Sequence, residues 1–268
     1  MYPFPIPIPC VTPITIGDPK KTGRTQPFSM TCENNGVQAD YIVKLWAKPE
    51  LFLGKHSLAR EVYGSLLAKS FGLDTPDISI VEIDQDFYLS QPQEKMEIIR
   101  ESAGKNFGSK FVPGATIFSP PVPIARHSEA VKIFCFDMLI CNPDRRLEKP
   151  NVFQTSKGFM VYDHEGAFPF SRPQMVLGGL SPCWEYIKDS WHKNHIFFPS
   201  IHNRDCSLEI EEFVISLGCL SIEILDTIEE QIPKDWSTGN DLQNIRLYLE
   251  NTRDNSQLFK RSLQEILA

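Results

Sequence analysis

The sequence has no long apolar run, no paired cysteine motif and no excess of basic charge. No window approaches the ~18 uninterrupted apolar residues of a membrane-spanning helix, so we expect no membrane span. The net charge of −7 at pH 7, without a basic stripe interleaved with aromatic residues, argues against direct binding of nucleic acid. Seven cysteines without a CxxC pair favour reduced thiols in a cytoplasmic protein over a disulfide scaffold.

The N-terminus is apolar but lacks the basic residues of a secretory leader. Its five prolines within residues 1–13 would break a helix, so we expect an extended, polyproline-like arm there. The whole chain, with 41% hydrophobic and 23% charged residues, has the composition of an ordinary globular protein. Its 268 residues suffice for one large domain or two modest lobes around a cleft.

Short strands dominate the first half of the chain. β-branched or aromatic runs bounded by Gly, Pro or Asn predict strands at 13–16, 27–32, 40–46, 78–83 and 109–115. The residues ENNG at 33–36 predict a hairpin turn. A single helix is expected among these strands, at 56–71, because Leu58, Val62 and Leu66 share one face and Gly72 closes the pattern.

Longer periodic patterns in the second half predict helices at 128–142, 209–232 and 241–268. Residues 172–205 are expected to form loops and short helices. We interpret the histidines of that region as surface residues and its tryptophans as lobe-packing residues: His192, His195, His202, Trp184 and Trp191. The expected fold is α+β, with a strand-rich N-lobe at 1–115, a helical C-lobe at 116–268 and a ligand cleft between them.

An acidic cluster follows the first helix of the second half. Asp144 and Asn151 lie in CNPDRRLEKPN (141–151), and Asp163 lies in VYDHEGAF (161–168). Two short strands, NVF and GFMVYD, form a hairpin that would bring Asn151 near Asp163. Phosphoryl transfer uses such a set, in which one carboxylate orients the attacking hydroxyl while an amide and a second carboxylate hold Mg²⁺. The alternative is a solvated turn, because Asn-Pro-Asp is a common turn sequence.

A lysine inside an apolar strand gives a second, independent signal. Lys44 lies in DYIVKLW (40–46), where an unpaired ammonium would be costly to desolvate. Glu61, in the predicted helix at 56–71, would pair with it, and together they would grip the phosphates of ATP. The alternatives are a lysine on the solvent face of a half-exposed strand and an ordinary exposed glutamate.

No GxGxxG motif is present to cover phosphates. GDPKKTGRT (17–25) is the candidate loop, with Lys21 and Gly23 as candidate binding residues, and a flexible basic hairpin is the alternative. Hydroxyls beside this loop predict autophosphorylation at Thr22 or Thr25. LGKHS (53–57) is rejected as a P-loop, because a histidine stands where Ser or Thr must bind Mg²⁺.

The segment FDMLICNPDRRLEKPNVFQTSKGFMVYDHEGAF resembles the catalytic segment of HipA-like kinases, in particular the compact HipA-like domain. It is more distantly similar to type II phosphatidylinositol kinases. Upstream, GRTQPFSMTCENNGVQADYIVKLW and AREVYGSLLAKSFGLDTPDISIVEI resemble the nucleotide lobe of that family, and NFGSKFVPGA its hinge strand. The resemblance covers roughly residues 12–235.

This resemblance implies a two-lobed, protein-kinase-like fold and transfer of the γ-phosphoryl group of ATP with Mg²⁺. It makes Asp144 the catalytic base, with Asn151 and Asp163 as metal ligands. Lys44 becomes the phosphate-gripping lysine, and Phe111 and Val112 line the adenine edge. Asp-His-Glu at 163–165 replaces Asp-Phe-Gly, and no His-Arg-Asp is present, so switching by a packed phenylalanine is not expected.

The acceptor implied by the family is a serine or threonine of a protein, and the setting is a bacterial toxin–antitoxin or defence module with a neutralising antitoxin partner. Two alternatives stay open, a lipid or small-molecule kinase and a pseudokinase that serves as a binding module. Of the two arginines after Asp144, we expect one to meet Asp137 or a substrate phosphate and the other to be solvated.

Overall fold

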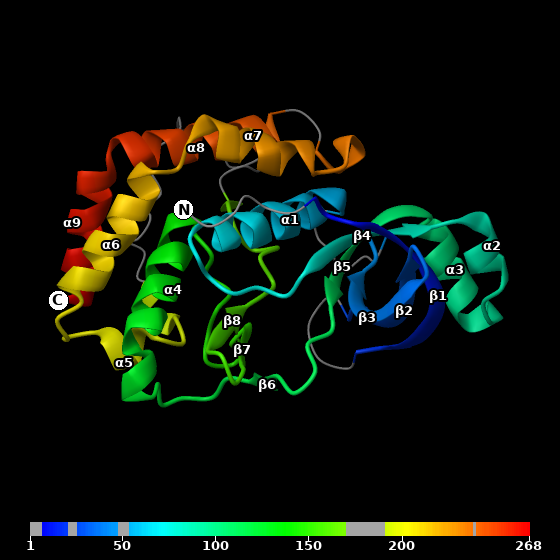
Figure 1. Ribbon diagram of the computed structural model, residues 1–268, viewed down its shortest axis with the longest axis horizontal. Coiled ribbons are helices and arrows are strands. Elements are labelled where there is room, and N and C mark those ends of the chain that lie inside the picture. The colour runs from blue at the N-terminus through cyan, green and yellow to red at the C-terminus, as the bar shows by residue number, and fades with distance from the viewer. Residues whose placement is uncertain (1–6, 21–25, 48–53, 170–190, 238–239) are drawn as a thin grey trace.

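Five strands of the first half close into a barrel in the order β1-β2-β3-β5-β4 (Figure 1). The computed structural model describes residues 7–20, 26–47, 54–169, 191–237 and 240–268. The strands are β1 (Cys10–Pro19), β2 (Phe28–Asn34), β3 (Val37–Lys44), β4 (Ile78–Ile83) and β5 (Gly104–Lys110). All neighbours are antiparallel except β1 and β4, which pair in parallel.

Alternating apolar residues explain why this barrel has its own core. On β2, Phe28, Met30 and Cys32 are buried, while the residues between them are half-buried. The β2–β3 hairpin turns through Asn35 and Gly36, with φ of 51° and 78°. Asn and Gly tolerate this left-handed region, which two-residue hairpin turns require, and the predicted turn is confirmed.

The strand-rich part contains more helix than the sequence predicts. Besides α1 (Lys55–Ser70), which matches the expected helix, it holds α2 (Gln85–Leu89) and α3 (Gln93–Glu101). The expectation of a single helix is wrong because α2 and α3 are short, at five and nine residues, and bury only one apolar residue each. The predicted strand at 109–115 is also wrong beyond Lys110. There β5 ends, and the chain turns through Gly114, whose φ is 74°.

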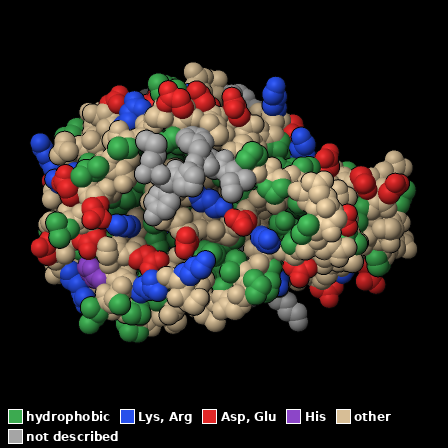
Figure 2. All heavy atoms as spheres, viewed as in Figure 1, with side chains coloured by type: hydrophobic (Ala, Val, Ile, Leu, Met, Phe, Trp, Pro, Cys, Tyr) green, Lys and Arg blue, Asp and Glu red, His purple; other side chains and the backbone are tan. Residues whose placement is uncertain are grey.

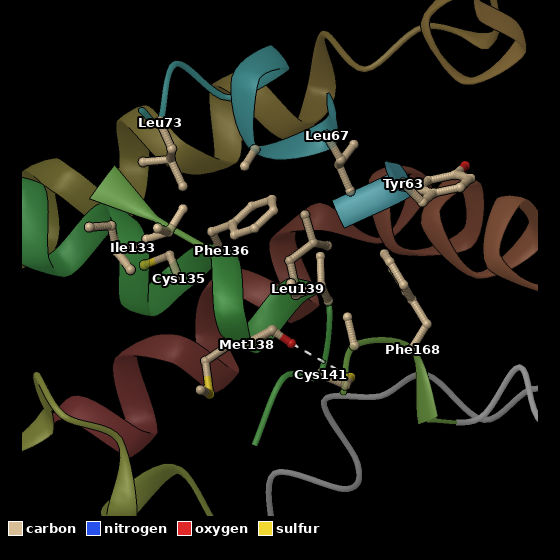
Figure 3. Close-up of a cluster of buried hydrophobic side chains, with 14 of the residues drawn as sticks. Tyr63, Leu67, Leu73, Ile133, Cys135, Phe136, Met138, Leu139, Cys141 and Phe168 are labelled. Atoms are coloured by element: carbon tan, nitrogen blue, oxygen red, sulfur yellow. Dashed lines mark hydrogen bonds between the residues drawn. The ribbon is translucent and has the colours of Figure 1, made fainter. Parts of the chain in front are cut away.

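Helix α1 lies between the barrel and the helical part. Twelve of its sixteen residues are buried, and it packs against β5 on one side and against α7 (Ile222–Glu230) and η6 (Lys234–Trp236) on the other. Figure 3 shows Leu67 of this helix beside the buried side chains of α4 and Tyr63 above Phe168, whose ring centroid lies 5.6 Å from that of Tyr63. The apolar core is therefore continuous from α1 into the second half of the chain.

Of the proline-rich arm, residues 1–6 lie outside the described part of the chain, and the residues from Cys10 onward already belong to β1. Before the strand begins, the Ile8 N–H donates to Gln231 Oε1 at 2.7 Å, and Ile8 packs against the core of the helical part. The arm thus connects the barrel to the end of α7.

The second half combines a small sheet with helices. The sheet order is β6-β7-β8, formed by β6 (Thr116–Ile117), β7 (Val152–Gln154) and β8 (Phe159–Val161). The remaining elements are η1 (Ile124–Arg126), α4 (His127–Leu139), η5 (Trp191–Asn194), α5 (Phe198–Ile201), α6 (Ser207–Gly218), α8 (Asp241–Asp254) and α9 (Ser256–Leu267). The predicted hairpin around Asn151 and Asp163 is confirmed as β7–β8.

Each of the two long helices expected near the C-terminus is a pair. The pattern at 209–232 is split into α6 and α7, because α6 ends at Gly218 and Ser221 caps α7 by accepting the N–H of Ile224. The pattern at 241–268 breaks at Asn255. Apolar periodicity continues across both breaks, so it does not reveal them.

Within the part of the chain that the structure describes, no helix has the length and apolarity needed to cross a membrane. The six cysteines of this part are all free thiols. On the face drawn in Figure 2, basic and acidic side chains lie interspersed over the described surface.

Candidate active site

Lys44 stands at the centre of a group of carboxylates. It is the last residue of β3 and only 9% exposed, so the solvent-face alternative does not apply. Its Nζ ion-pairs with Glu61 and lies 2.7 Å from Asp163 Oδ1 and 2.9 Å from Glu165 Oε2. Burial acts to lower the pKa of Lys44, but the three carboxylates outweigh it and raise that pKa well above its usual range. The ammonium therefore stays charged.

Glu61 joins the barrel to the loop after β8. Its side chain is 1% exposed, with one carboxylate oxygen on Lys44 and the other accepting the His164 N–H at 2.7 Å. Burial raises the pKa of Glu61 to about 7, against the opposing pull of the Lys44 ammonium. A glutamate held from both sides fixes the distance between β3 and Asp163, the neighbour of His164.

The β7–β8 hairpin places Asn151 and Asp163 at its two ends in the same unusual backbone conformation. Their φ angles are 49° and 63°, in the left-handed region that Asn and Asp tolerate better than other non-glycine residues. The Tyr162 N–H donates to the Asn151 carbonyl at 3.1 Å, which ties the two ends together. Asn151 Nδ2 lies 3.4 Å from the backbone carbonyl of Asp144.

Asp144 reaches the same cluster through a second lysine. Lys149 Nζ lies 2.5 Å from Asp144 Oδ2 and 2.9 Å from Asp163 Oδ2. A continuous chain of ion pairs therefore runs from Asp144 through Lys149, Asp163 and Lys44 to Glu61. The residues predicted from two distant parts of the sequence lie in one place.

The donor set in this cluster fits a hard divalent cation. Oxygen atoms of Glu61, Asp163 and Glu165 all lie within 4.8 Å of one another. Carboxylate and amide oxygens are the ligands that Mg²⁺ prefers, and the amide of Asn151 is of that kind. Glu165 and Lys149 are not among the sequence-predicted site residues. The sequence did offer a signal for each: Glu165 lies two residues after Asp163, and Lys149 lies two residues before Asn151.

Of the candidate residues that the structure describes, Phe111 and Val112 do not join this cluster. Phe111 is 50% exposed on the connection after β5, and its N–H donates to the carbonyl of Asp40 at 2.7 Å. Asp40 and Lys44 are four residues apart on β3, which at ~3.3 Å per residue separates their backbones by about 13 Å. The backbone of Phe111 therefore meets β3 well away from Lys44. Val112 follows Phe111 and is half-buried. Lys21 and Gly23 lie outside the described residues, as do Thr22 and Thr25.

A buried polar network supports the loop that carries Asp144. Arg145 is completely buried, and its guanidinium donates to both carboxylate oxygens of Asp137, at 2.5 and 3.2 Å. The same guanidinium donates to the backbone carbonyls of Asn151 and, at 3.2 Å, Tyr162. Arg145 directly follows Asp144, and its side chain binds the carbonyl of Asn151 and the carbonyl of Tyr162, which precedes Asp163. It therefore ties the loop of Asp144 to both ends of the β7–β8 hairpin. As expected, the other arginine, Arg146, is partly solvated, with a 45% exposed side chain.

His195 completes this network, and the expectation that it is a surface residue is wrong. It is 3% exposed, its Nε2 lies 2.9 Å from Asp137 Oδ2, and its Nδ1 accepts the Phe197 N–H at 3.2 Å. Nε2 of His195 must therefore carry the proton, which it donates to Asp137.

The other expectations for this region have mixed outcomes. His192 is also buried, at 6% exposure, so the expectation that it is a surface residue is wrong, whereas His202 is half-buried. Trp191 packs against the core as a partly buried residue, and Trp184 lies outside the described residues.

The network predicts a loss of stability in mild acid. Burial lowers the pKa of His195, whereas an unfolded histidine takes up its proton near pH ~6.5. Burial acts to raise the pKa of Asp137, but Arg145 and His195 outweigh it and lower that pKa to about 2. For both groups the unfolded chain binds more protons as pH falls, so stability decreases, below ~6.5 through His195 and below ~4 through Asp137.

We expect His195→Gln, which keeps a donor for Asp137 but does not titrate, to reduce the loss of stability between pH ~6.5 and ~4.5. Urea unfolding at a series of pH values measures the effect, with His202→Gln as the matched control. Equal pH slopes in wild type and His195→Gln would contradict it.

Gly64 allows α1 to approach the loop that follows Asp163. A Cβ built on this glycine would lie 2.5 Å from Cβ and 2.8 Å from Cγ of His164, closer than such atoms approach. His164 is fully buried, its N–H holds Glu61, and burial lowers the pKa of its imidazole to about 3. The ring thus packs as a neutral group in the space that a side chain at position 64 would take.

We expect Gly64→Ala to lower activity about 100-fold, because a shift of ~1 Å in a catalytic group has effects of that size. Alanine normally stabilises a helix by ~1 kcal/mol relative to glycine, but here overpacking should lower the free energy of unfolding by about 1–3 kcal/mol. Turnover and urea unfolding measure the two effects. Gly218→Ala is the control, since a Cβ there meets no atom within 4 Å. Full activity in Gly64→Ala would show that the close approach does not position the loop.

A strand barrel, a helical part and charged side chains gathered from both define the two-lobed fold of protein-kinase-like phosphotransferases. The sequence model of the HipA-like kinases matches residues 14–265, and the chain belongs to this family. No curated protein matches it. Among solved structures, it is similar to the Helicobacter pylori proinflammatory kinase CtkA, with a TM-score of 0.59 and 12% identity over 97% of this chain and 99% of that one. At this identity the likeness concerns the fold.

Proposed function

We propose that the protein transfers the γ-phosphoryl group of ATP, with Mg²⁺, to the hydroxyl of a serine or threonine in a protein. The observation that carries the proposal is the chain of ion pairs from Asp144 to Glu61. It assembles an acceptor-side carboxylate, a metal-binding carboxylate and a buried lysine from both halves of the chain.

Each residue has one task in this proposal. The Lys44 ammonium donates to phosphate oxygens, and Glu61 holds it in place. Asn151 and Asp163 would hold Mg²⁺, which when bound neutralises charge on the transferred group. Asp144 orients the acceptor hydroxyl and accepts its proton. Phe111 and Val112, on the connection between the lobes, would border the adenine.

Two alternatives remain for the acceptor and for the activity. The distant similarity to phosphatidylinositol kinases favours a lipid or small molecule as the acceptor, and a pseudokinase would bind ATP without transferring phosphate. Labelled ATP with Mg²⁺, given to the protein alone and with cell lysate, separates them. We expect label on serine or threonine of a protein. Label in the organic phase would identify a lipid kinase, and bound ATP without transfer would identify a pseudokinase.

The family also motivates a biological setting, a toxin or defence kinase of the bacterial cytoplasm that a partner protein neutralises. Expression of the wild-type protein in growing bacteria should then arrest growth, whereas Asp144→Asn should not. Equal growth with both proteins would remove the toxin setting and leave the kinase activity to be judged by the labelling experiment.

A further inference from the structure

A tight turn fixes the position of Lys149. The N–H of Arg146 donates to the carbonyl of Lys149 at 3.0 Å, and the N–H of Lys149 donates back at 3.1 Å. Leu147 is exposed at the tip, and Pro150 restricts the backbone before Asn151. These two hydrogen bonds close the turn from Arg146 to Lys149. They place Lys149 beside both ends of the loop that runs from Asp144 to Asn151.

The Lys149 ammonium lies between two carboxylates that have separate tasks. Its 2.5 Å contact with Asp144 and 2.9 Å contact with Asp163 use one oxygen of each. The other oxygen of Asp163 contacts Lys44. Both oxygens of Asp163 thus face an ammonium group. The Lys149 side chain is only 28% exposed, which is low for the most strongly hydrated cationic side chain.

We propose that Lys149 is a built-in counter-ion, which holds Asp144 and Asp163 together and competes with the divalent cation for Asp163. The inference rests on the proposed metal-binding role of Asp163. In this inference Lys149 sets the affinity of the site for metal. That affinity would stay low until the ammonium of Lys149 moves away from Asp163.

The physical reason is that an ammonium and a divalent cation cannot share one carboxylate oxygen without strong repulsion. A metal that binds Asp163 through Oδ2 must therefore displace Lys149 and break a charge-assisted hydrogen bond. Bonds of this kind shift a binding constant by about 10- to 100-fold. The phosphates of a nucleotide would offer the displaced ammonium a new partner, so metal should bind well only together with the nucleotide.

The experiment measures binding of Mn²⁺ alone, without nucleotide, by the loss of the free Mn²⁺ signal in electron paramagnetic resonance. We expect Lys149→Met to bind Mn²⁺ about 10- to 100-fold more tightly than wild type. Lys149→Arg keeps the charge and should resemble wild type. Arg146→Met is the matched control, because it removes the same charge from the same turn but its 45% exposed side chain contacts Asp144 and not Asp163. Circular dichroism checks that each variant is folded.

The outcomes separate the inference from the proposed function. If Asp163→Asn abolishes Mn²⁺ binding while Lys149→Met leaves it unchanged, the metal site stands and the counter-ion role is overturned. Equal gains in Lys149→Met and Arg146→Met would reduce the effect to long-range charge and also overturn that role. If neither wild type nor Lys149→Met binds Mn²⁺, the counter-ion role is overturned, because removal of the competing ammonium should have raised the affinity. The metal site is then judged separately, by repeating the labelling experiment without Mg²⁺, and unchanged transfer there would overturn it.

Discussion

Asp144→Asn should lower the rate of phosphoryl transfer by about 100- to 10,000-fold while ATP still binds. Asparagine has the shape of aspartate but cannot accept the proton of the acceptor hydroxyl. In the structure the carboxylate is oriented by Lys149 at 2.5 Å and Arg146 at 3.3 Å, and its side chain is 23% exposed, so an acceptor can reach it. Steady-state measurement of kcat and of KM for ATP tests the expectation.

The control for this variant is Asp254→Asn, an equal charge change at a 64% exposed carboxylate near the end of α8. It should leave both constants unchanged. A kcat for Asp144→Asn close to that of wild type would rule out Asp144 as the base. A raised KM with an unchanged kcat would mean that this carboxylate serves binding alone.

Arg145→Leu should lower the free energy of unfolding by about 3–5 kcal/mol, because it leaves the buried carboxylate of Asp137 without its cationic partner. The loss is large beside the 5–15 kcal/mol or so by which domains are commonly stable. It also removes the donor from the carbonyls of Asn151 and Tyr162. Urea unfolding, with Arg146→Leu as the neighbouring control, measures the change.

The double variant Asp137→Leu with Arg145→Leu separates stability from positioning. Replacing both members of a buried ion pair by apolar residues commonly restores stability. The two carbonyls still lack their donor, so we expect activity to stay low in the restored protein. Recovery of activity together with stability would show that the guanidinium does not position Asn151 and Asp163.

Local chemistry made part of this structure predictable. The β2–β3 turn followed from Asn and Gly, and the apolar surroundings of Lys44 in the sequence required partners for its charge. The β7–β8 hairpin followed from two short strands separated by a turn. In each case the residues that decide the structure lie within one short segment, so their pattern is visible before the chain folds.

The features that were missed depend on distant segments. His195 is buried against Asp137, which lies 58 residues earlier in the chain. The residues next to His195 in the sequence do not predict that contact. The contacts of Glu165 and Lys149 likewise depend on how β3 and the β7–β8 hairpin meet. The helix breaks after Gly218 and at Asn255 were missed for a different reason, since the apolar pattern continues through them.

The burial of α1 has a consequence for control of the enzyme and for inhibitors. To rotate this helix outward and separate Glu61 from Lys44, the protein would have to expose Leu58, Val62 and Leu66, which are almost inaccessible. Each would lose about 1.5–3 kcal/mol of burial, a large part of the stability of a domain. We therefore do not expect this protein to be switched off by an outward rotation of α1.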